Sequence, residues 1–490
     1  MTSDSRVGVY SRYFQYTTID RCDFTTSTNN CSTVLFGAAP TTALAGIGGG
    51  GPYDQDAWGA QNITTARADF DLGGFQNQLI AGVDVSYQTN DKLFYAYTLP
   101  AVGSGIYTLG THTQSRANIG ISLFNPVHAP PAGYTVFLPT LATIANSTAT
   151  ATTVLKSTGN ATDYAFFATD RFWFTPQWSV IAGFRYDDYL ANYSSTAVNL
   201  AVTPLKSKSG LFNPRASVVF EPTADQTYYF SWGRSAIPQG TSIVGAATGI
   251  ATAQVNLDPE KSQTFEVGAK IALFDGALGL AGSAFNIQKS NALQVDPVSG
   301  EVTVQSGERD RVNGFQLSAT GQIVDDWTLN AAYTFLDSRI TSDNACTTTT
   351  APAPPPHPAV SCLPNPVTIG LPVIFVPKHA GSFWTTYDLH DWAPGLSAGG
   401  GMTYQSAMNV RYTTSGNVFV PATFVMSRIA RIPRTLSFDA YVAYQVDQLR
   451  FALNVQNLTD ELYYTQSFGN RGTPAPGRTF LFSVSWTPNL

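Results

Sequence analysis

The chain has 490 residues and a net charge of −6, which is small for this length and identifies no class of partner. Only 12% of the residues are charged, against roughly 25% in an average soluble protein; Ser, Thr, Asn, Gln, Gly and Tyr fill the difference. The 23 Tyr, 30 Phe and 8 Trp exclude a disordered chain, which would be poor in aromatic residues. This composition suits a surface that meets lipid on one side and water on the other.

The N-terminus has no basic segment followed by an apolar one, so it is not a secretory signal. No run of about 18 or more apolar residues follows, which excludes a transmembrane helix. A chain of this kind crosses a bilayer only as a closed β-barrel, because lipid offers no other way to satisfy the backbone. We therefore expect that an export signal has been removed or that the sequence begins partway through a longer protein.

Alternation of apolar with polar or small residues predicts β-strands along the chain. In residues 178–186, Trp178, Val180 and Phe184 alternate with Gln, Ser and Arg side chains. The same pattern recurs in residues 327–335, 436–446, 449–456 and 480–486. Alternation alone also fits a soluble β-sandwich, so the lengths of the connections between strands are needed to distinguish a sandwich from a membrane barrel.

Short turns and long connections alternate strictly, which predicts about sixteen strands. The short turns are expected at residues 71–74, 175–177, 221–226, 275–276, 324–326, 391–395 and 447–448. The long connections are expected at residues 18–56, 90–159, 190–207, 234–259, 291–306, 340–378, 408–432 and 465–476. Tight periplasmic turns and long extracellular loops are the plan of a transmembrane antiparallel β-barrel, so we predict that all-β fold.

The four cysteines form two local pairs, Cys22 with Cys31 and Cys346 with Cys362, all in long connections. Neither pair has the two-residue spacing of a zinc site, and no His lies at ligand spacing, so we expect no metal site. We predict two disulfides instead, each closing a loop in an oxidising compartment.

Several motifs resemble those of TonB-dependent outer-membrane receptors. The most specific is NVQNLTDELYY at residues 454–464, followed by PGRTF at residues 476–480. Earlier matches are NLDPEKS and FEVGAK within residues 256–270, and RVNGFQL at residues 311–317, then DWTL and AYT. Together they run from about Asn213 to Trp486. LFNP at residues 123–126 and the region 256–289 look most like siderophore receptors, with the catecholate branch as the first choice.

The resemblance implies a barrel of about 22 strands in the outer membrane of a Gram-negative cell, plugged by an N-terminal domain. It implies import of a ferric siderophore with energy from the TonB–ExbB–ExbD complex, and contact with outer-membrane lipid and lipopolysaccharide. The sequence departs from this pattern because it has no plug domain and no TonB-contacting segment, and about six strands are missing. We therefore expect residues 1–490 to be an N-terminally truncated barrel, whose last strand ends on Trp486 followed by four further residues.

An anionic, aromatic iron chelate calls for cations and flat amphipathic side chains above the lumen. Candidates at the bases of the loops are Tyr95, Tyr97, Tyr107, Tyr134, Arg234, Arg411, Tyr412, Arg428, Arg431 and Arg471, with Lys206 and Lys208. The alternative is structural, since Tyr also forms the girdles at both membrane interfaces and loop arginines also bind lipopolysaccharide phosphate. Pro259, Glu260, Asn457 and Asp460 are expected to hold strand ends and turns.

Two alternatives stay open beside the siderophore receptor: a passive porin-like diffusion channel and a non-functional fragment of a receptor. Porins have 16 to 18 strands and need no plug, which the strand count fits, but they lack the block at residues 454–464. No nucleophile stands near a His, so we predict no enzyme, and no cofactor beyond a transported iron–siderophore complex. The dispersed basic residues speak against nucleic acid.

Overall fold

Antiparallel β-strands dominate the computed structural model. It describes residues 1–14, 18–21, 42–46, 52–98, 108–109, 112–113, 118–122, 135–147, 149–238, 258–295, 302–348, 360–415, 421–468 and 471–488. Helical structure in this part is limited to two 3-10 turns, Ile144–Asn146 and Pro421–Thr423. No helix among the described residues has the length and apolar character needed to cross a membrane.

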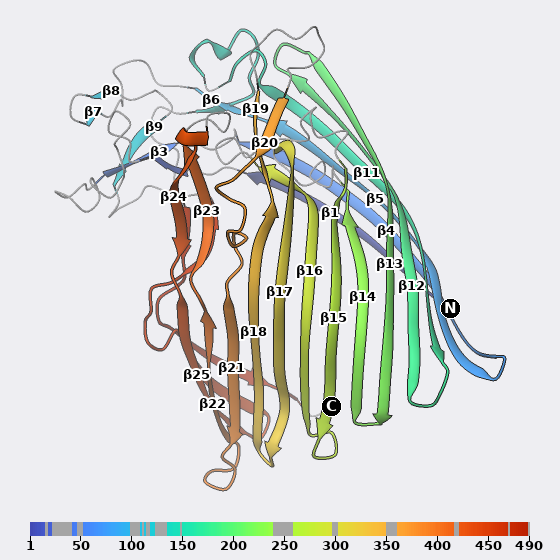
Figure 1. Ribbon diagram of the computed structural model, residues 1–490. Helices are drawn as coiled ribbons and strands as arrows, with labels where there is room; N and C mark the ends of the chain where they lie inside the picture. Colours follow the sequence, from blue (N-terminus) through green and yellow to red (C-terminus); the bar gives the residue numbers. More distant parts are fainter. Residues whose placement is uncertain are drawn as a thin grey trace.

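Sixteen strands form one antiparallel sheet in which each strand pairs with its neighbours in chain order (Figure 1). In that order they are β1 (Thr2–Phe14), β4 (Tyr53–Leu72), β5 (Phe75–Phe94), β11 (Val154–Trp173), β12 (Trp178–Ala197), β13 (Val202–Thr223), β14 (Gln226–Ile237), β15 (Glu260–Leu273), β16 (Leu278–Val295), β17 (Val302–Val324), β18 (Trp327–Ser342), β21 (His379–Asp388), β22 (Leu396–Gln405), β25 (Thr435–Val446), β26 (Leu449–Gln456) and β29 (Thr479–Trp486). The predicted fold class and strand number are confirmed.

Each of the seven predicted short turns joins two consecutive strands of this sheet. The β4–β5 hairpin turns at Gly73 and Gly74, whose φ angles of 62° and 86° suit a turn that follows the right-handed twist of the strands. Two long connections were predicted too long. Residues 190–207 continue β12 to Ala197 and β13 from Val202, and residues 291–306 include the ends of β16 and β17. At the loop end these strands no longer need an apolar face, so the alternation that marks a strand weakens although the strands continue.

Additional short strands lie in the long connections at the loop end of the sheet. They pair as β3 (Thr42–Gly46) with both β2 (Thr18–Arg21) and β9 (Asn118–Ser122), β6 (Ala96–Tyr97) with β10 (Val136–Phe137), β7 (Thr108–Leu109) with β8 (His112–Thr113), β19 (Asn344–Thr348) with β20 (Val360–Pro364), β23 (Met408–Ser415) with β24 (Val425–Ile432), and β27 (Tyr464–Phe468) with β28 (Arg471–Pro474). All lie in predicted long connections, so these connections contain hairpins of their own.

The register separates an apolar face of the sheet from a polar one. Directly paired residues share a face, and one such row across β14–β18 is Phe230, Val267, Ala284, Phe315 and Phe335. The adjacent row, on the opposite face, is Tyr229, Gly268, Ser283, Gln316 and Thr334. Because only the apolar face can meet hydrocarbon, it is the outer face, and the polar face lines the lumen.

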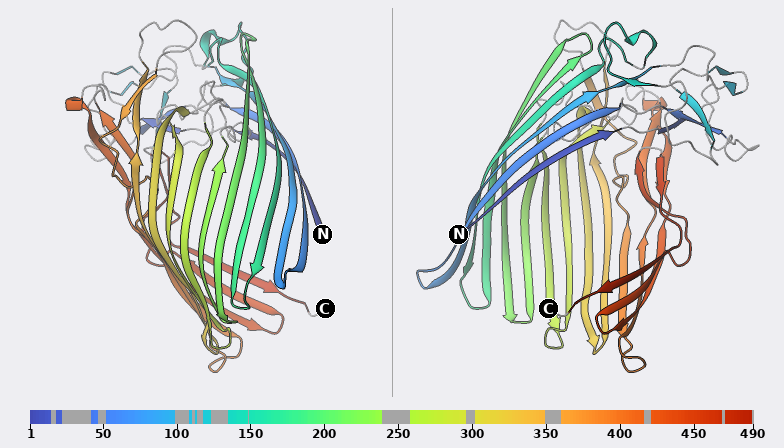
Figure 2. Two further views of the ribbon diagram at one scale, coloured as in Figure 1. Left: turned by 45° about the vertical axis from the view of Figure 1, so that its right-hand side comes forward. Right: turned by 180° about the vertical axis from the view of Figure 1, so that it is seen from behind.

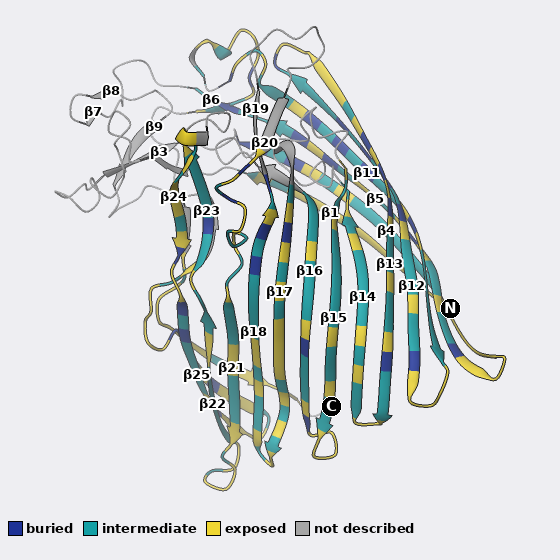
Figure 3. Ribbon diagram, viewed as in Figure 1, coloured by how far each residue is buried: buried dark blue, intermediate teal, exposed yellow. Residues whose placement is uncertain are grey.

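Buried positions gather on the lumen face toward the loop end, most clearly along β4, β5 and β11–β13 (Figure 3). A small core there joins Ala161, Tyr189, Ala191 and Tyr193, against which Leu205 packs. Many outer-face side chains are instead exposed, such as Phe230 at 50% and Val267 at 56%. The sheet therefore has no central core of the soluble type, because lipid takes that role for its outer face.

The last hairpin is held by Asn457, which is 3% exposed and has a φ of 51°. Its side-chain amide donates to the carbonyl oxygens of Glu461 (2.9 Å) and Pro476 (3.3 Å), and its Oδ1 accepts from the Glu461 amide (2.8 Å). Asp460 Oδ1 accepts from the Arg478 amide at 2.8 Å. These contacts match the expected structural role of both residues at a strand end.

Replacing Asn457 by Ala should lower the free energy of unfolding by about 3 kcal/mol, because three hydrogen bonds of a buried side chain are lost and a left-handed residue loses its local support. Urea unfolding in lipid vesicles, followed by Trp fluorescence, measures the change. Asn454→Ala in the same region of β26 is the control and should change it by less than about 0.5 kcal/mol. Equal effects of both variants would contradict the role of Asn457.

Two strands form open edges of the described sheet, since β1 pairs only with β4 and β29 only with β26. Residues of both strands are exposed along almost their whole length. Seen from behind, the blue N-terminal strand and the red C-terminal strands stand apart, with the opposite wall visible between them (Figure 2). The sixteen strands are thus a curved wall, and their pairing does not close it.

The refolded chain alone should form no sealed barrel in a planar bilayer, because each unpaired N–H and C=O on an edge in hydrocarbon costs several kcal/mol. We expect unstable, leaky conductance that added ferric siderophore does not change, while a closed 16-stranded porin recorded alongside gives steady steps. Tight closure with ligand-dependent protection would contradict this prediction.

Candidate functional site

A cluster of cations and aromatic rings lies on the lumen side at the loop end of β1, β4 and β5. Arg12 donates from Nη2 to the Tyr53 hydroxyl at 2.6 Å and from Nε to Gln55 Oε1 at 2.9 Å. Gln55 in turn donates to Asn90 Oδ1 at 2.7 Å. Lys92 Nζ lies 5.4 Å from the centre of the Tyr53 ring. Two cations thus lie within cation–π distance of the Tyr53 ring, an arrangement that this attraction stabilises.

Lys92 is 2% exposed, and burial, followed by repulsion from Arg12, lowers its pKa to about 8. Lys92 lies near the end of β5, about 40 Å above the turn at Phe75 if the strand is tilted by about 45°. The apolar band of such a barrel is about 25 Å tall, so Lys92 lies above the membrane. A pKa of about 8 leaves Lys92 mostly protonated at neutral pH. The cluster therefore keeps positive charge at the mouth of the barrel.

Lower on the lumen wall, Arg185 of β12 joins three carboxylates from three strands. Its guanidinium lies 2.6 Å from Asp187, 3.1 Å from Asp84 and 3.5 Å from Asp163. Gln61 adds a hydrogen bond to Asp84 at 2.9 Å. Three carboxylates around one cation leave a negative wall, and Asp163 Oδ1 is buried without a hydrogen-bond partner among the described residues.

The predicted tyrosines at the loop bases that the structure describes are mostly held by the protein itself. Tyr95 donates to Asp54 Oδ2 at 2.6 Å, and Tyr97 is 2% exposed in β6. The Tyr412 hydroxyl donates to the Pro372 carbonyl at 2.7 Å and accepts from Asn409 at 2.8 Å. These three side chains brace strand ends in the structure described. Tyr107 and Tyr134 lie outside the described residues.

The β23–β24 hairpin brings together four of the predicted residues: Arg411, Tyr412, Arg428 and Arg431. Arg431 donates to Asn409 Oδ1 at 2.9 Å and is itself exposed, as is Arg428. Arg411 Nε is buried and has no hydrogen-bond partner among the described atoms. Arg428 and Arg431 are therefore the predicted cations that this hairpin offers to solvent.

The structure places other predicted cations away from the lumen. Arg234 pairs with Gln263 in the row four residues above Phe230, on the outer face. Lys206 and Lys208 share the face of Tyr186, which is also outer, and Lys208 lies 3.2 Å from Asp188. Of Arg471, only its backbone position in β28 is described.

The second predicted disulfide has a suitable backbone, since Cys346 and Cys362 are direct partners in the β19–β20 hairpin. Paired residues on antiparallel strands have Cα atoms about 4.5–5.5 Å apart, within the range that a disulfide requires. Cys22 and Cys31 lie outside the described residues. Both bonds stay predictions.

The Arg12–Lys92 cluster and the Arg185 network were not predicted from the sequence. A signal for the second existed, because Asp84, Asp163, Arg185 and Asp187 all occupy lumen-facing positions of predicted strands. No comparable signal marked Arg12, whose partners come from strands that are distant in sequence.

Comparison with known proteins decides the family. Residues 2–458 match the family described as TonB dependent receptor-like, beta-barrel. The chain belongs to the TonB-dependent receptor β-barrel family. It is 27% identical over 445 residues to the probable TonB-dependent siderophore receptor PiuA of Acinetobacter baumannii, covering 88% of this chain and 53% of PiuA. It is 25% identical over 355 residues to the catecholate siderophore receptor Fiu of Escherichia coli, covering 67% of this chain and 42% of Fiu.

The crystal structure of PiuA from Acinetobacter baumannii superposes with a TM-score of 0.73 at 22% identity, covering 99% of this chain and 62% of PiuA. This likeness supports the fold alone. The chain spans about half the length of the curated relatives it matches. The family consists of outer-membrane receptors and transporters, so this TonB-dependent receptor barrel is an outer-membrane protein and not an enzyme.

Proposed function

We propose that this chain is the barrel part of a receptor that imports ferric siderophores across the outer membrane with energy from TonB. The observation that carries the proposal is the similarity over 88% of the chain to PiuA, a probable siderophore receptor. The catecholate class is the first choice of ligand, which the similarity to Fiu, a catecholate siderophore receptor, supports.

The charges at the loop end suit such a ligand. Ferric catecholates are anionic and aromatic, so a binding surface needs cations and flat rings. Arg12, Lys92 and Tyr53 supply these at the lumen mouth, although Lys92 and Tyr53 are buried. The exposed Arg428 and Arg431 supply accessible charge on the β23–β24 hairpin, and we assign first contact with the ligand to these two.

We further propose that additional strands close the wall between β1 and β29, and that a plug domain fills its lumen and links it to the TonB–ExbB–ExbD complex. The unpaired edges support the first part of this proposal. The negative wall around Arg185, with its unpartnered Asp163 oxygen, supports the second, because buried polar groups are normally satisfied. The surface of the plug that meets this wall would carry Lys or Arg side chains.

Uptake of iron tests the function. The full gene, with any in-frame sequence upstream of Met1, is expressed in cells that lack their own catecholate receptors. We expect growth on a ferric catecholate as the only iron source, and loss of that growth in matched cells without TonB. Growth that persists without TonB would favour a passive porin-like channel, and no growth on any defined siderophore would favour a non-functional fragment.

Replacing Arg428 and Arg431 together by Gln in that full-length protein should weaken binding of the ferric siderophore by roughly thirtyfold to a thousandfold, because each lost charge-assisted hydrogen bond is worth about 1–2 kcal/mol. Equilibrium binding to whole cells measures the change. Replacing Lys206 and Lys208 together by Gln, an equal change in charge on the outer face, should leave affinity unaltered. An unchanged affinity in the double variant would remove these residues from the site.

A further inference from the structure

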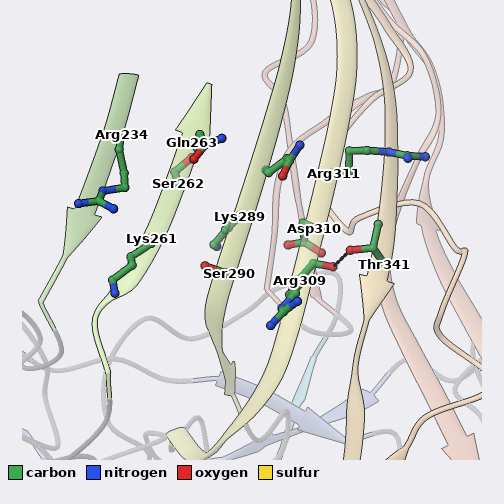
Figure 4. Close-up of a pocket in the computed structure, with 11 residues that line it drawn as sticks. Arg234, Lys261, Ser262, Gln263, Lys289, Ser290, Arg309, Asp310, Arg311 and Thr341 are labelled. Atoms are coloured by element: carbon green, nitrogen blue, oxygen red, sulfur yellow. Dashed lines mark hydrogen bonds between the residues drawn. The ribbon is translucent and has the colours of Figure 1, made fainter. Parts of the chain in front are cut away.

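Five cations gather on the outer face of the sheet at the loop end of β14–β18. Arg234 and Arg311 lie in one row of paired residues with Arg339 at its end. Lys261 and Arg309 lie in the next row toward the loops, joined through Ser290. We call Arg234, Lys261, Arg309, Arg311 and Arg339 the outer cation patch. Four of them line a surface hollow of about 580 Å³, in which Arg339 has no part (Figure 4).

Few acids neutralise this patch. Arg339 pairs with Asp337 at 2.9 Å, and Arg234 donates to the Phe212 carbonyl at 3.0 Å. Lys261, Arg309 and Arg311 have no carboxylate within ion-pair distance among the residues that the structure describes, and all three are exposed. Lys289 and Asp310 also line the hollow, but they and Glu260, the ion-pair partner of Lys289, lie on rows that face the lumen. The patch therefore presents at least three uncompensated positive charges to the outside.

The height of the patch matches the membrane surface. On β18 the outer-face residues from Trp327 to Phe335 are apolar or small, Asp337 follows, and then Arg339. Twelve residues separate Trp327 from Arg339, which is about 40 Å along a strand and about 30 Å of height when the strand is tilted by about 40°. An apolar band about 25 Å tall thus ends just below the cations, where lipid headgroups lie.

A second hollow lies directly below, on the outer face of β15–β18. It has a volume of about 440 Å³, and small side chains form its floor. The outer-face residues that line it are Ala269, Ile271, Leu280, Gly282, Leu317, Ala319, Ala331 and Tyr333. Six residues separate Arg311 from Leu317, which is about 20 Å along the strand. Two outer-face rows lie between them, first Phe265, Asn286 and Asn313, and then Val267, Ala284 and Phe315.

From these two hollows we propose a binding site for one phosphorylated lipid of the outer leaflet, with its phosphate groups on the outer cation patch and an acyl chain in the apolar hollow. Charge complementarity identifies the headgroup as anionic, since Arg and Lys at a membrane surface attract phosphate. The apolar hollow at acyl depth commits the site to a lipid, because free phosphate or a soluble acidic protein leaves that hollow unused. The site faces away from the lumen and is independent of siderophore import.

The test is lipid binding to the receptor in detergent micelles, measured by native mass spectrometry. The probes are lipid A with two phosphates, the same lipid after enzymatic dephosphorylation, and inorganic phosphate. We expect the diphosphorylated lipid to bind, the dephosphorylated lipid to bind at least tenfold more weakly, and millimolar inorganic phosphate not to displace it. Equal binding of both lipids, or displacement by inorganic phosphate, would overturn the proposal.

Variants locate the site. The triple variant Lys261→Gln, Arg309→Gln, Arg311→Gln should lower lipid affinity on the order of a hundredfold, at roughly fivefold for each lost charge near a membrane surface. Ala319→Phe, which fills the apolar hollow without changing charge, should also weaken lipid binding. The control is Lys270→Gln, which removes one positive charge from the lumen face of β15 and should bind lipid normally, whereas Arg311→Gln alone, an equal charge change, should bind it roughly fivefold more weakly. Loss of binding in this control, or none in the triple variant, would contradict the assignment.

Discussion

The constraint on which the rest of the structure depends is that lipid offers no hydrogen bonds to a polypeptide backbone. Every N–H and C=O at membrane depth must be paired within the protein, and a single antiparallel sheet does this for all strands except the two at its ends. The ladder from β4 to β26 satisfies the condition with direct, nearly unbroken registers. Strands β1 and β29 do not, so the edge that each presents is the structural reason to look for further strands.

Pairing along the ladder also fixes which side chains meet lipid. Because directly paired residues share a face, a single register assigns whole rows at once, so Phe230 and Phe335 lie on the same side although four strand pairings separate them. A shift by one residue would turn such a row into the lumen. The apolar row therefore specifies the register, and the register then determines where every charged residue of those strands must lie.

Much of the fold was predictable from sequence because its signals are local. The alternation at Trp178 to Phe184 and the turns at Gly73 and Asp447 each depend on neighbouring residues only. The prediction failed at residues 190–207, where β12 and β13 run beyond the bilayer and no longer need an apolar face. Above the membrane both faces meet water or loops, so the alternation that marks a strand weakens although the strand continues.

The candidate site was less predictable because its geometry is not local. Tyr412 was chosen as a ligand group, yet its hydroxyl is used by Asn409 and Pro372, and only the folded hairpin reveals this. Arg12 was overlooked because Tyr53 and Gln55 bind it from β4, and Lys92 of β5 contacts the same Tyr53 ring.

Arg234 was also predicted only in part. It lies at a loop base as expected, but on the outer face of the sheet and not on the lumen face. A charged residue at the end of a membrane strand has two destinations, the lumen and the lipid surface, and composition does not distinguish them. The number of residues between Phe230 and Arg234 distinguishes the two faces, because side chains an even number of residues apart along a strand lie on the same face. Of the cations chosen by type alone, Arg428 and Arg431 therefore remain candidates for the transported ligand, whereas Arg234 belongs to a surface that faces lipid headgroups.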